Sequence, residues 1–236
     1  MSLFLLPAGY ARIRMVISFD ELATTAFEEG VNALCWPRSL KADFGEVAGL
    51  LRGGAGITAL DPETLTGLSA GLAGRSAVEI MLEDLRLLRE HGAAPELNCI
   101  GSYPRETNAG PVRTDVYSFH ADSAMAEADT WLCTYYGAPS EGLRNDEACR
   151  KVDIPEIRSA LLHAFGGRDE GEFTEYLNDN CYDLHYSAQP SARPFSFGLG
   201  NLWRIAVDYP GCPVPPCIHR APETGPDTPP RLLLIG

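Results

Sequence analysis

The chain has 236 residues, of which 45% are hydrophobic and 22% charged, and it contains 23 glycines and 18 prolines. This composition is that of a globular protein with many turns, and it argues against a disordered or fibrous chain. The net charge is −13, and no stretch shows the basic clustering that contacts to phosphate backbones require, so nucleic acid is not an expected partner. The short apolar run near the start lacks a basic region before it and is too short to cross a bilayer, which predicts neither a signal nor a membrane anchor.

The seven cysteines are an odd number and are scattered over the chain. They lack the dense, even spacing of a small secreted domain held together by disulfides. We therefore expect reduced thiols and a cytoplasmic protein.

Helices dominate the expected structure of residues 1–94. Short helices are predicted at 20–30 and 40–51, separated by a strand at 31–37. The clearest amphipathic helix covers 76–92, with Ser76 as the expected N-cap and a stripe of apolar residues that would pack on a sheet. We expect this part to support a β-rich core.

From residue 95 onward the pattern changes to short β-branched and aromatic segments between turns. Strands are predicted at 97–103, 116–120, 130–137, 202–209, 216–221 and 231–236. A polar, partly helical insert at 144–187 interrupts them, and an insert of this size is often a lid or a substrate-reading element. We expect one domain over 1–236, with its core at 95–236.

The segment VYSFHADS places His120 and Asp122 two residues apart on a predicted strand, so both side chains leave the same face. His219 follows 219 − 120 = 99 residues later on another predicted strand. Two imidazoles and one carboxylate on one face leave three adjacent coordination positions open. This arrangement favours iron(II) that binds a co-substrate and O2 together.

Arg231 lies 231 − 219 = 12 residues beyond His219, at the start of an apolar strand. Its planar guanidinium can hold a carboxylate through two hydrogen bonds, as the distal end of 2-oxoglutarate requires. An alternative is a surface arginine that pairs with an acidic neighbour.

These residues resemble the motif of the iron(II)- and 2-oxoglutarate-dependent dioxygenase superfamily, which has His-x-Asp, a distal His and a basic residue soon after it. The segments CIGSYPRETNAGPVRTDVYSFHAD and WLCTYYGAP are similar to the prolyl-hydroxylase type, and FHAD, LCTYYG and HRAP…PRLLLIG are similar to a bacterial family of uncharacterised proteins. The resemblance covers roughly residues 97–236. It implies that Tyr136 contacts the co-substrate carboxylate, with Tyr103 and Thr134 as further candidates. Thr134 and Tyr136 are expected on one strand face.

The predicted fold is therefore mainly β with flanking helices, a double-stranded β-helix of the jelly-roll, cupin-like kind. The expected activity is hydroxylation of a small-molecule or peptide substrate, with Fe(II), 2-oxoglutarate and O2. Two alternatives are a cupin-like metalloenzyme that does not use 2-oxoglutarate and a non-catalytic barrel for a small ligand. A zinc site at Cys212, Cys217 and His219, with Cys181 and His185, is a further alternative, although the spacing is not that of a zinc knuckle. The sequence leaves the prime substrate and the oligomeric state open.

Overall fold

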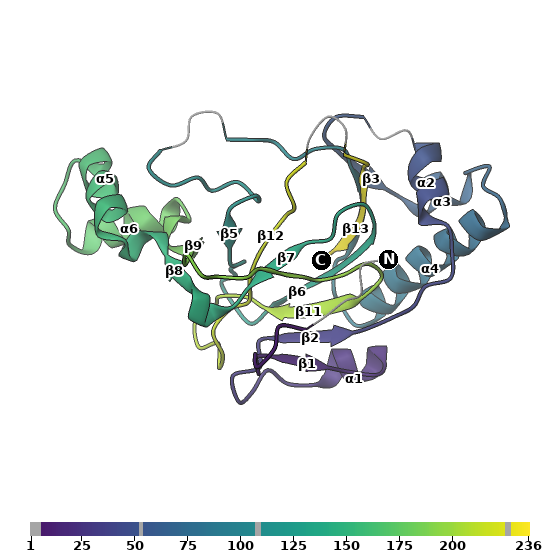
Figure 1. The fold of residues 1–236 in the computed structure, drawn as a ribbon, viewed down its shortest axis with the longest axis horizontal. Coiled ribbons are helices and arrows are strands. Elements are labelled where there is room, and N and C mark those ends of the chain that lie inside the picture. Colours follow the sequence, from purple (N-terminus) through teal and green to yellow (C-terminus); the bar gives the residue numbers. More distant parts are fainter. Residues whose placement is uncertain (1–5, 52–53, 107–109, 225–227) are drawn as a thin grey trace.

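Two β-sheets form the centre of the protein, in a computed structural model that describes residues 6–51, 54–106, 110–224 and 228–236 (Figure 1). The seven-stranded sheet has the order β1-β2-β11-β6-β13-β4-β3 and the six-stranded sheet the order β10-β7-β12-β5-β9-β8. The first sheet consists of β1 (Ile13–Met15), β2 (Ala33–Trp36), β3 (Ile57–Leu60), β4 (Glu96–Ile100), β6 (Asp129–Tyr136), β11 (Leu202–Ala206) and β13 (Arg231–Ile235). The second consists of β5 (Phe119–His120), β7 (Glu141–Leu143), β8 (Ala148–Arg150), β9 (His185–Ala188), β10 (Phe195–Ser196) and β12 (Ile218–Arg220).

From residue 96 onward the chain crosses repeatedly between the two sheets, although β7, β8, β9 and β10 follow one another in the six-stranded sheet. Strands β4, β6, β11 and β13 lie in the seven-stranded sheet, while β5, β7, β10 and β12 lie in the six-stranded one. All pairings among these eight strands are antiparallel. The protein is therefore mainly β, as predicted, and its two sheets are built from interleaved parts of the sequence.

The seven-stranded sheet is covered by helices on one face and meets the second sheet on the other. The helices are α1 (Phe19–Thr24), α2 (Phe44–Leu51), α3 (Pro62–Thr66) and α4 (Leu72–Glu90). Odd-numbered residues of β6, such as Trp131 and Cys133, pack with α2 and α4, whereas Leu132 packs with Phe197 and Cys217 between the sheets. The alternation follows from the two-residue period of a strand.

Residues 1–94 contribute more than the helical support that the sequence predicts. Strands β1 and β2 extend one edge of the seven-stranded sheet, and β3 extends the other. Helix α4 also begins at Leu72, so Ser76 lies inside the helix and is not its N-cap. The cause is tertiary: the Glu46 carboxylate accepts a hydrogen bond from the Gly71 backbone N–H at 2.7 Å and so satisfies a donor at the helix start.

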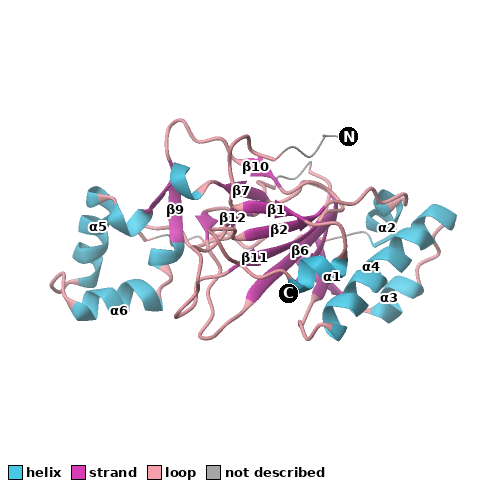
Figure 2. Cartoon of the chain, turned by 90° about the horizontal axis from the view of Figure 1, so that it is seen from below, coloured by secondary structure: helices cyan, strands magenta, loops and turns pink. Residues whose placement is uncertain are grey.

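The insert at 144–187 contains the predicted helices, α5 (Pro155–Phe165) and α6 (Gly171–Asp179), and three short 3-10 turns, η1 (Asn145–Glu147), η2 (Lys151–Asp153) and η3 (Tyr182–Leu184). The two helices share a small core that includes Leu161, Phe173 and Leu177. They project from the end of the molecule opposite α2–α4 (Figures 1 and 2). The insert does more than interrupt the strands, because its β8 and β9 extend the six-stranded sheet beyond β5.

The described part of the chain contains no helix that is both long and apolar enough to cross a membrane. All seven cysteines are free thiols.

Candidate metal centre

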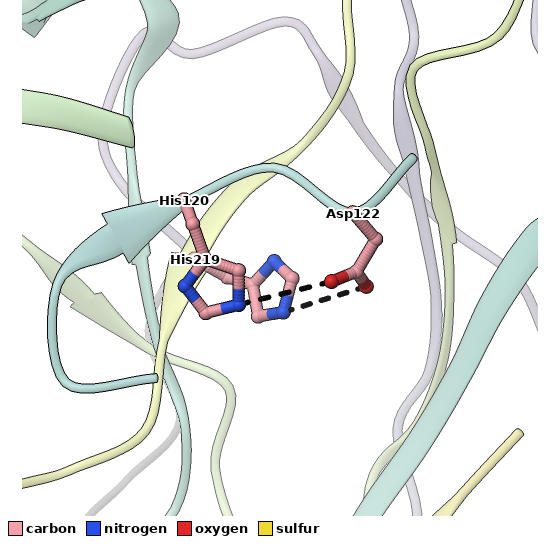
Figure 3. A group of neighbouring side chains, drawn as sticks. All are labelled: His120, Asp122 and His219. Atoms are coloured by element: carbon pink, nitrogen blue, oxygen red, sulfur yellow. Dashed lines mark ion pairs between the residues drawn. The ribbon is translucent and has the colours of Figure 1, made fainter. Parts of the chain in front are cut away.

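The structure brings together His120 at the end of β5, Asp122 two residues further on and His219 of β12 (Figure 3). Their potential ligand atoms all lie within 4.8 Å of one another. Asp122 Oδ1 is 3.7 Å from His120 Nε2, and Asp122 Oδ2 is 3.7 Å from His219 Nε2. The three side chains are thus within reach of a single metal ion. In the part of the chain that the structure describes, no other group of histidines, cysteines and carboxylates meets this criterion.

Strand register explains why the two histidines meet. In the antiparallel pair β12–β5, His219 lies directly opposite His120, and their ring centroids are 4.6 Å apart. On the other side of β5, His120 lies opposite His185 of β9, with ring centroids 5.7 Å apart. Directly opposed residues point to the same face of a sheet. Three histidines from three adjacent strands therefore form one row.

The backbone fixes how the two histidine ligands are oriented. His120 Nδ1 is 2.8 Å from the Ser118 carbonyl, and His219 Nδ1 is 3.4 Å from the Cys217 carbonyl. A carbonyl only accepts, so in each contact Nδ1 carries the proton, and Nε2 is the ring nitrogen that faces Asp122. Outer contacts of this kind orient the imidazoles that bind metal ions.

The charge states of His120 and Asp122 are those that metal binding requires. Burial, together with the neighbouring His219, lowers the pKa of His120 to about 4. Burial alone would raise the pKa of Asp122, but His219, a 2.6 Å hydrogen bond donated by Thr130 Oγ1, and His120 lower it overall. At neutral pH His120 therefore offers a neutral imidazole and Asp122 an anionic carboxylate, the forms in which these side chains bind a metal ion.

Arg231, the predicted carboxylate clamp, is buried and is only 1% exposed. It donates hydrogen bonds to Tyr103 Oη (2.6 Å), Ser140 Oγ (3.0 Å) and Thr134 Oγ1 (3.3 Å), while its Nε has no partner. Arg231 forms no ion pair among the described residues, so the alternative of a surface arginine paired with an acid is wrong. Burial lowers the pKa of the guanidinium. A buried cation whose contacts are all neutral is costly, and an anionic ligand would offset that cost.

Of the three residues that the resemblance assigned to the co-substrate, Tyr103 and Thr134 lie beside Arg231 and Tyr136 does not. Tyr136 packs on the helix-covered face of the sheet, where its ring lies against Gly45 of α2. The expectation that Thr134 and Tyr136 share a face is wrong because the pairing of β6 with β13 shifts register: Thr134 pairs with Leu233 but Tyr136 pairs with Leu232. Such a β-bulge reverses the alternation beyond it.

The cysteines predicted as an alternative zinc site do not join His219 in a metal-binding group among the described residues. Cys217 is buried between the two sheets, where it packs with Phe197 and Trp203. It therefore has a packing role, and the structure gives no support to the zinc alternative.

Three contributors to the site escape the sequence reasoning or receive too little weight in it. Ser140 and Thr130 hold Arg231 and Asp122 by single hydrogen bonds across the fold, and an isolated serine or threonine has no periodic signal that marks such a role. His185 is 4% exposed and stands beside His120, whereas the sequence pattern indicated it only as part of the alternative zinc site.

Comparison of the chain with protein-family models, with curated proteins and with solved structures finds no match. The functional conclusion therefore depends on the geometry of the site.

Proposed function

We propose that this protein is a non-haem iron(II) and 2-oxoglutarate-dependent oxygenase that hydroxylates a small polar substrate. In this reaction the substrate R–H, 2-oxoglutarate and O2 become R–OH, succinate and CO2, with one oxygen atom going to each organic product. The observation that carries the proposal is the combination of a His-Asp-His cluster with a buried arginine that has no carboxylate partner among the described residues.

The strand order supports a double-stranded β-helix as the framework of the proposed enzyme. Eight strands are divided between the two sheets and pair antiparallel within each, as in jelly-roll folds, with four in the order β11-β6-β13-β4 and four in the order β10-β7-β12-β5. In this framework β5 and β12 supply His120 and His219 from one sheet, and the segment that directly follows β5 supplies Asp122. Strand β13 supplies Arg231 from the other.

The donor set fits iron(II). Two imidazole nitrogens and one carboxylate oxygen are typical of non-haem iron(II) sites that keep adjacent coordination positions open. The side chains of His120, Asp122 and His219 are 15%, 32% and 9% exposed, so the cluster is recessed but open to small molecules. When bound there, the metal supplies the activation of O2 and the oxidising chemistry.

The position of Arg231 relative to the ligands fits a short dicarboxylate. Its guanidinium bonds Ser140, which directly precedes β7, and in β7 Gly142 lies opposite His219. The arginine thus reaches the strand next to a proposed metal ligand. One carboxylate and the keto group of 2-oxoglutarate would face the metal ligands, and Arg231 and Tyr103 would hold the other carboxylate. The protein's own contribution is to position the co-substrate and exclude water.

The test is an anaerobic titration of metal-free protein with Fe(II) and then 2-oxoglutarate. We expect about one Fe(II) per chain and a visible charge-transfer absorption that requires 2-oxoglutarate, followed by succinate after O2 is admitted. Asp122→Ala removes the only anionic ligand and should abolish the charge-transfer absorption and the formation of succinate. Asp179→Ala, on the exposed end of α6, should retain both. Fe(II) binding without any effect of 2-oxoglutarate would instead indicate the cupin-like enzyme without this co-substrate. A stoichiometric zinc held by Cys212 and Cys217 would overturn the assignment.

A further inference from the structure

A second polar cluster lies beside the metal ligands, on the side away from Arg231. It consists of Asp115, Ser118, Lys151 and His185, and it is called the flanking cluster below. In the six-stranded sheet, Ser140 precedes β7 on one side of the metal-binding strands β12 and β5, while β9 with His185 lies on the other side. The proposed metal site therefore lies between a buried arginine and this cluster.

Short contacts hold the flanking cluster together. Lys151 Nζ donates a 2.7 Å hydrogen bond to Ser118 Oγ, and the Ser118 backbone N–H donates to the Asp115 carbonyl at 3.1 Å. The carbonyl of the same Ser118 contacts His120 Nδ1. His185 faces His120 directly across the β5–β9 pair. The segment from Asp115 to His120 thus connects the cluster rigidly to a proposed metal ligand.

Two atoms in this cluster lack the partners that buried polar atoms normally have. His185 is 4% exposed, and its Nδ1 has no hydrogen-bond partner. Asp115 Oδ2 is buried and also has none. The half-buried Lys151 has its hydrogen bond to Ser118 but forms no ion pair with any described residue. Burial lowers the pKa of its ammonium, Asp115 raises it and Arg113 lowers it further. Unpartnered buried groups are rare in proteins and commonly mark a ligand site.

The two charges indicate what the ligand carries. Lys151 and Asp115 both contact Ser118, through the Lys151 ammonium and the Asp115 carbonyl, yet the ammonium and the Asp115 carboxylate do not approach within the 4.0 Å of an ion pair. A purely anionic ligand would satisfy Lys151 and be repelled by Asp115, and a purely cationic ligand would meet the reverse problem. A ligand with both charges satisfies both residues, and the neutral imidazole of His185 can add one hydrogen bond.

We infer that the flanking cluster binds a zwitterionic substrate, a free α-amino acid, with its carboxylate at Lys151 and its ammonium group at Asp115. Held there, the side chain of the amino acid extends past His185 toward the metal ligands. Hydroxylation of the bound amino acid rests on the proposed function, whereas binding of the amino acid does not depend on it. Lys151, Asp115 and His185 are positioning and specificity residues in this arrangement.

The experiment measures the binding of free α-amino acids by calorimetry, to metal-free protein and to protein loaded anaerobically with Mn(II) and 2-oxoglutarate. At least one amino acid should bind. Its N-acetyl derivative loses the charged ammonium group and its carboxamide loses the charged carboxylate, so each should bind at least about tenfold more weakly than the free amino acid. Lys151→Met should abolish the preference for the free carboxylate alone, and Asp115→Asn the preference for the free ammonium alone. Lys41→Met and Asp179→Asn, which change exposed residues elsewhere, should preserve both preferences.

The outcomes separate this inference from the proposed function. If Mn(II) and 2-oxoglutarate bind but no free amino acid binds to either form, or if only doubly capped peptides bind, the inference is wrong and the proposed function stands. If amino acids bind with the expected preferences but Mn(II) and 2-oxoglutarate do not bind, the proposed function is wrong and the inference about amino-acid binding stands. Lys151→Met and Asp115→Asn proteins must retain Mn(II) affinity, which also shows that they fold.

Discussion

At the scale of one residue, Arg231 is a charged side chain that is buried without a charged partner among the described residues. The guanidinium is removed from water, contacts three neutral hydroxyl groups and keeps an unpartnered Nε. Such an arrangement is costly for folding in the absence of a ligand and is favourable once a carboxylate is bound. The residue is therefore explained better by ligand binding than by stability.

Replacing Arg231 with Lys tests this explanation. Lysine keeps the positive charge but loses the planar fork, so 2-oxoglutarate affinity should fall about tenfold or more, while Mn(II) affinity measured without 2-oxoglutarate should stay near the wild-type value. Isothermal titration under anaerobic conditions measures both. An unchanged affinity for 2-oxoglutarate would show that Arg231 does not hold it.

The buried histidines predict how the stability of the metal-free protein depends on pH. Burial lowers the pKa of His120 to about 4 and of His185 to about 3, each with a further contribution from a neighbouring histidine. Between these values and the ordinary value of about 6.5, the unfolded chain binds more protons than the folded one. The free energy of unfolding should thus be highest above pH 6.5 and fall as the pH decreases toward 4, by up to about 1.4 kcal/mol per pH unit for each histidine.

Urea unfolding at several pH values measures this slope. His185→Phe removes one of the two groups and should make the slope smaller, whereas His163→Phe, on the exposed side of α5, should leave it unchanged. Equal slopes for wild type and His185→Phe would contradict the burial of a neutral imidazole at position 185.

At the scale of elements, the end of β6 decides which side chains face the site. Beyond the bulge, Gly137 adopts a positive φ of 82°, and a Cβ there would lie 2.7 Å from the Pro230 carbonyl and 3.1 Å from Arg231 Cα. The turn after β6 thus depends on a residue without a side chain, and it holds the backbone of Arg231 in place.

Gly137→Ala should therefore lower the free energy of unfolding by about 1–3 kcal/mol and weaken 2-oxoglutarate binding as well, since the backbone of Arg231 must shift. Gly211→Ala is the matched control, because Gly211 has a similar φ of 87° and open space around its Cβ position. Gly211→Ala should lower the free energy of unfolding through its backbone conformation but leave 2-oxoglutarate binding unchanged. Loss of binding in both variants would argue against a specific contact at Gly137.

The same elements show what the sequence can and cannot predict. The convergence of His120 and Asp122 was predictable because residues two apart in an extended segment leave the same face, and the structure places His219 beside them as expected. The role of Arg231 as a carboxylate clamp stays a prediction. Tyr136 was assigned wrongly because a bulge depends on the pairing of β6 with β13, which no local pattern encodes. The start of α4 was likewise missed because the group that caps it, Glu46, belongs to another helix.

At the scale of the whole molecule, one buried ion pair connects the helical layer to the sheet. Arg38, just after β2, donates to both carboxylate oxygens of Asp84 in α4, at 2.5 and 2.8 Å, and Tyr135 Oη of β6 donates to the same carboxylate at 2.6 Å. The pair is almost fully removed from water, with side-chain exposures of 9% and 3%. Loss of one partner leaves the other charge buried and unpaired.

Asp84→Ala should accordingly lower the free energy of unfolding by about 3–5 kcal/mol. The adjacent residue offers a control, because Glu83 pairs with Arg86 on the exposed face of the same helix and Glu83→Ala should leave stability almost unchanged. Denaturant unfolding of the three proteins measures the difference. Equal stabilities of Asp84→Ala and wild type would mean that the helical layer is held by apolar packing alone.

The central position of β13 has a consequence for synthesis of the protein. This strand lies between β6 and β4, although it follows the end of β6 by 231 − 136 = 95 residues. At translation rates of 5–20 residues per second, the 95 residues from the end of β6 to β13 take roughly 5–20 s to synthesise, so β6 and the earlier β4 are complete well before the strand that joins them. During this time their inward edges are open to other nascent chains, and chaperones that shield such edges should raise the yield of folded protein.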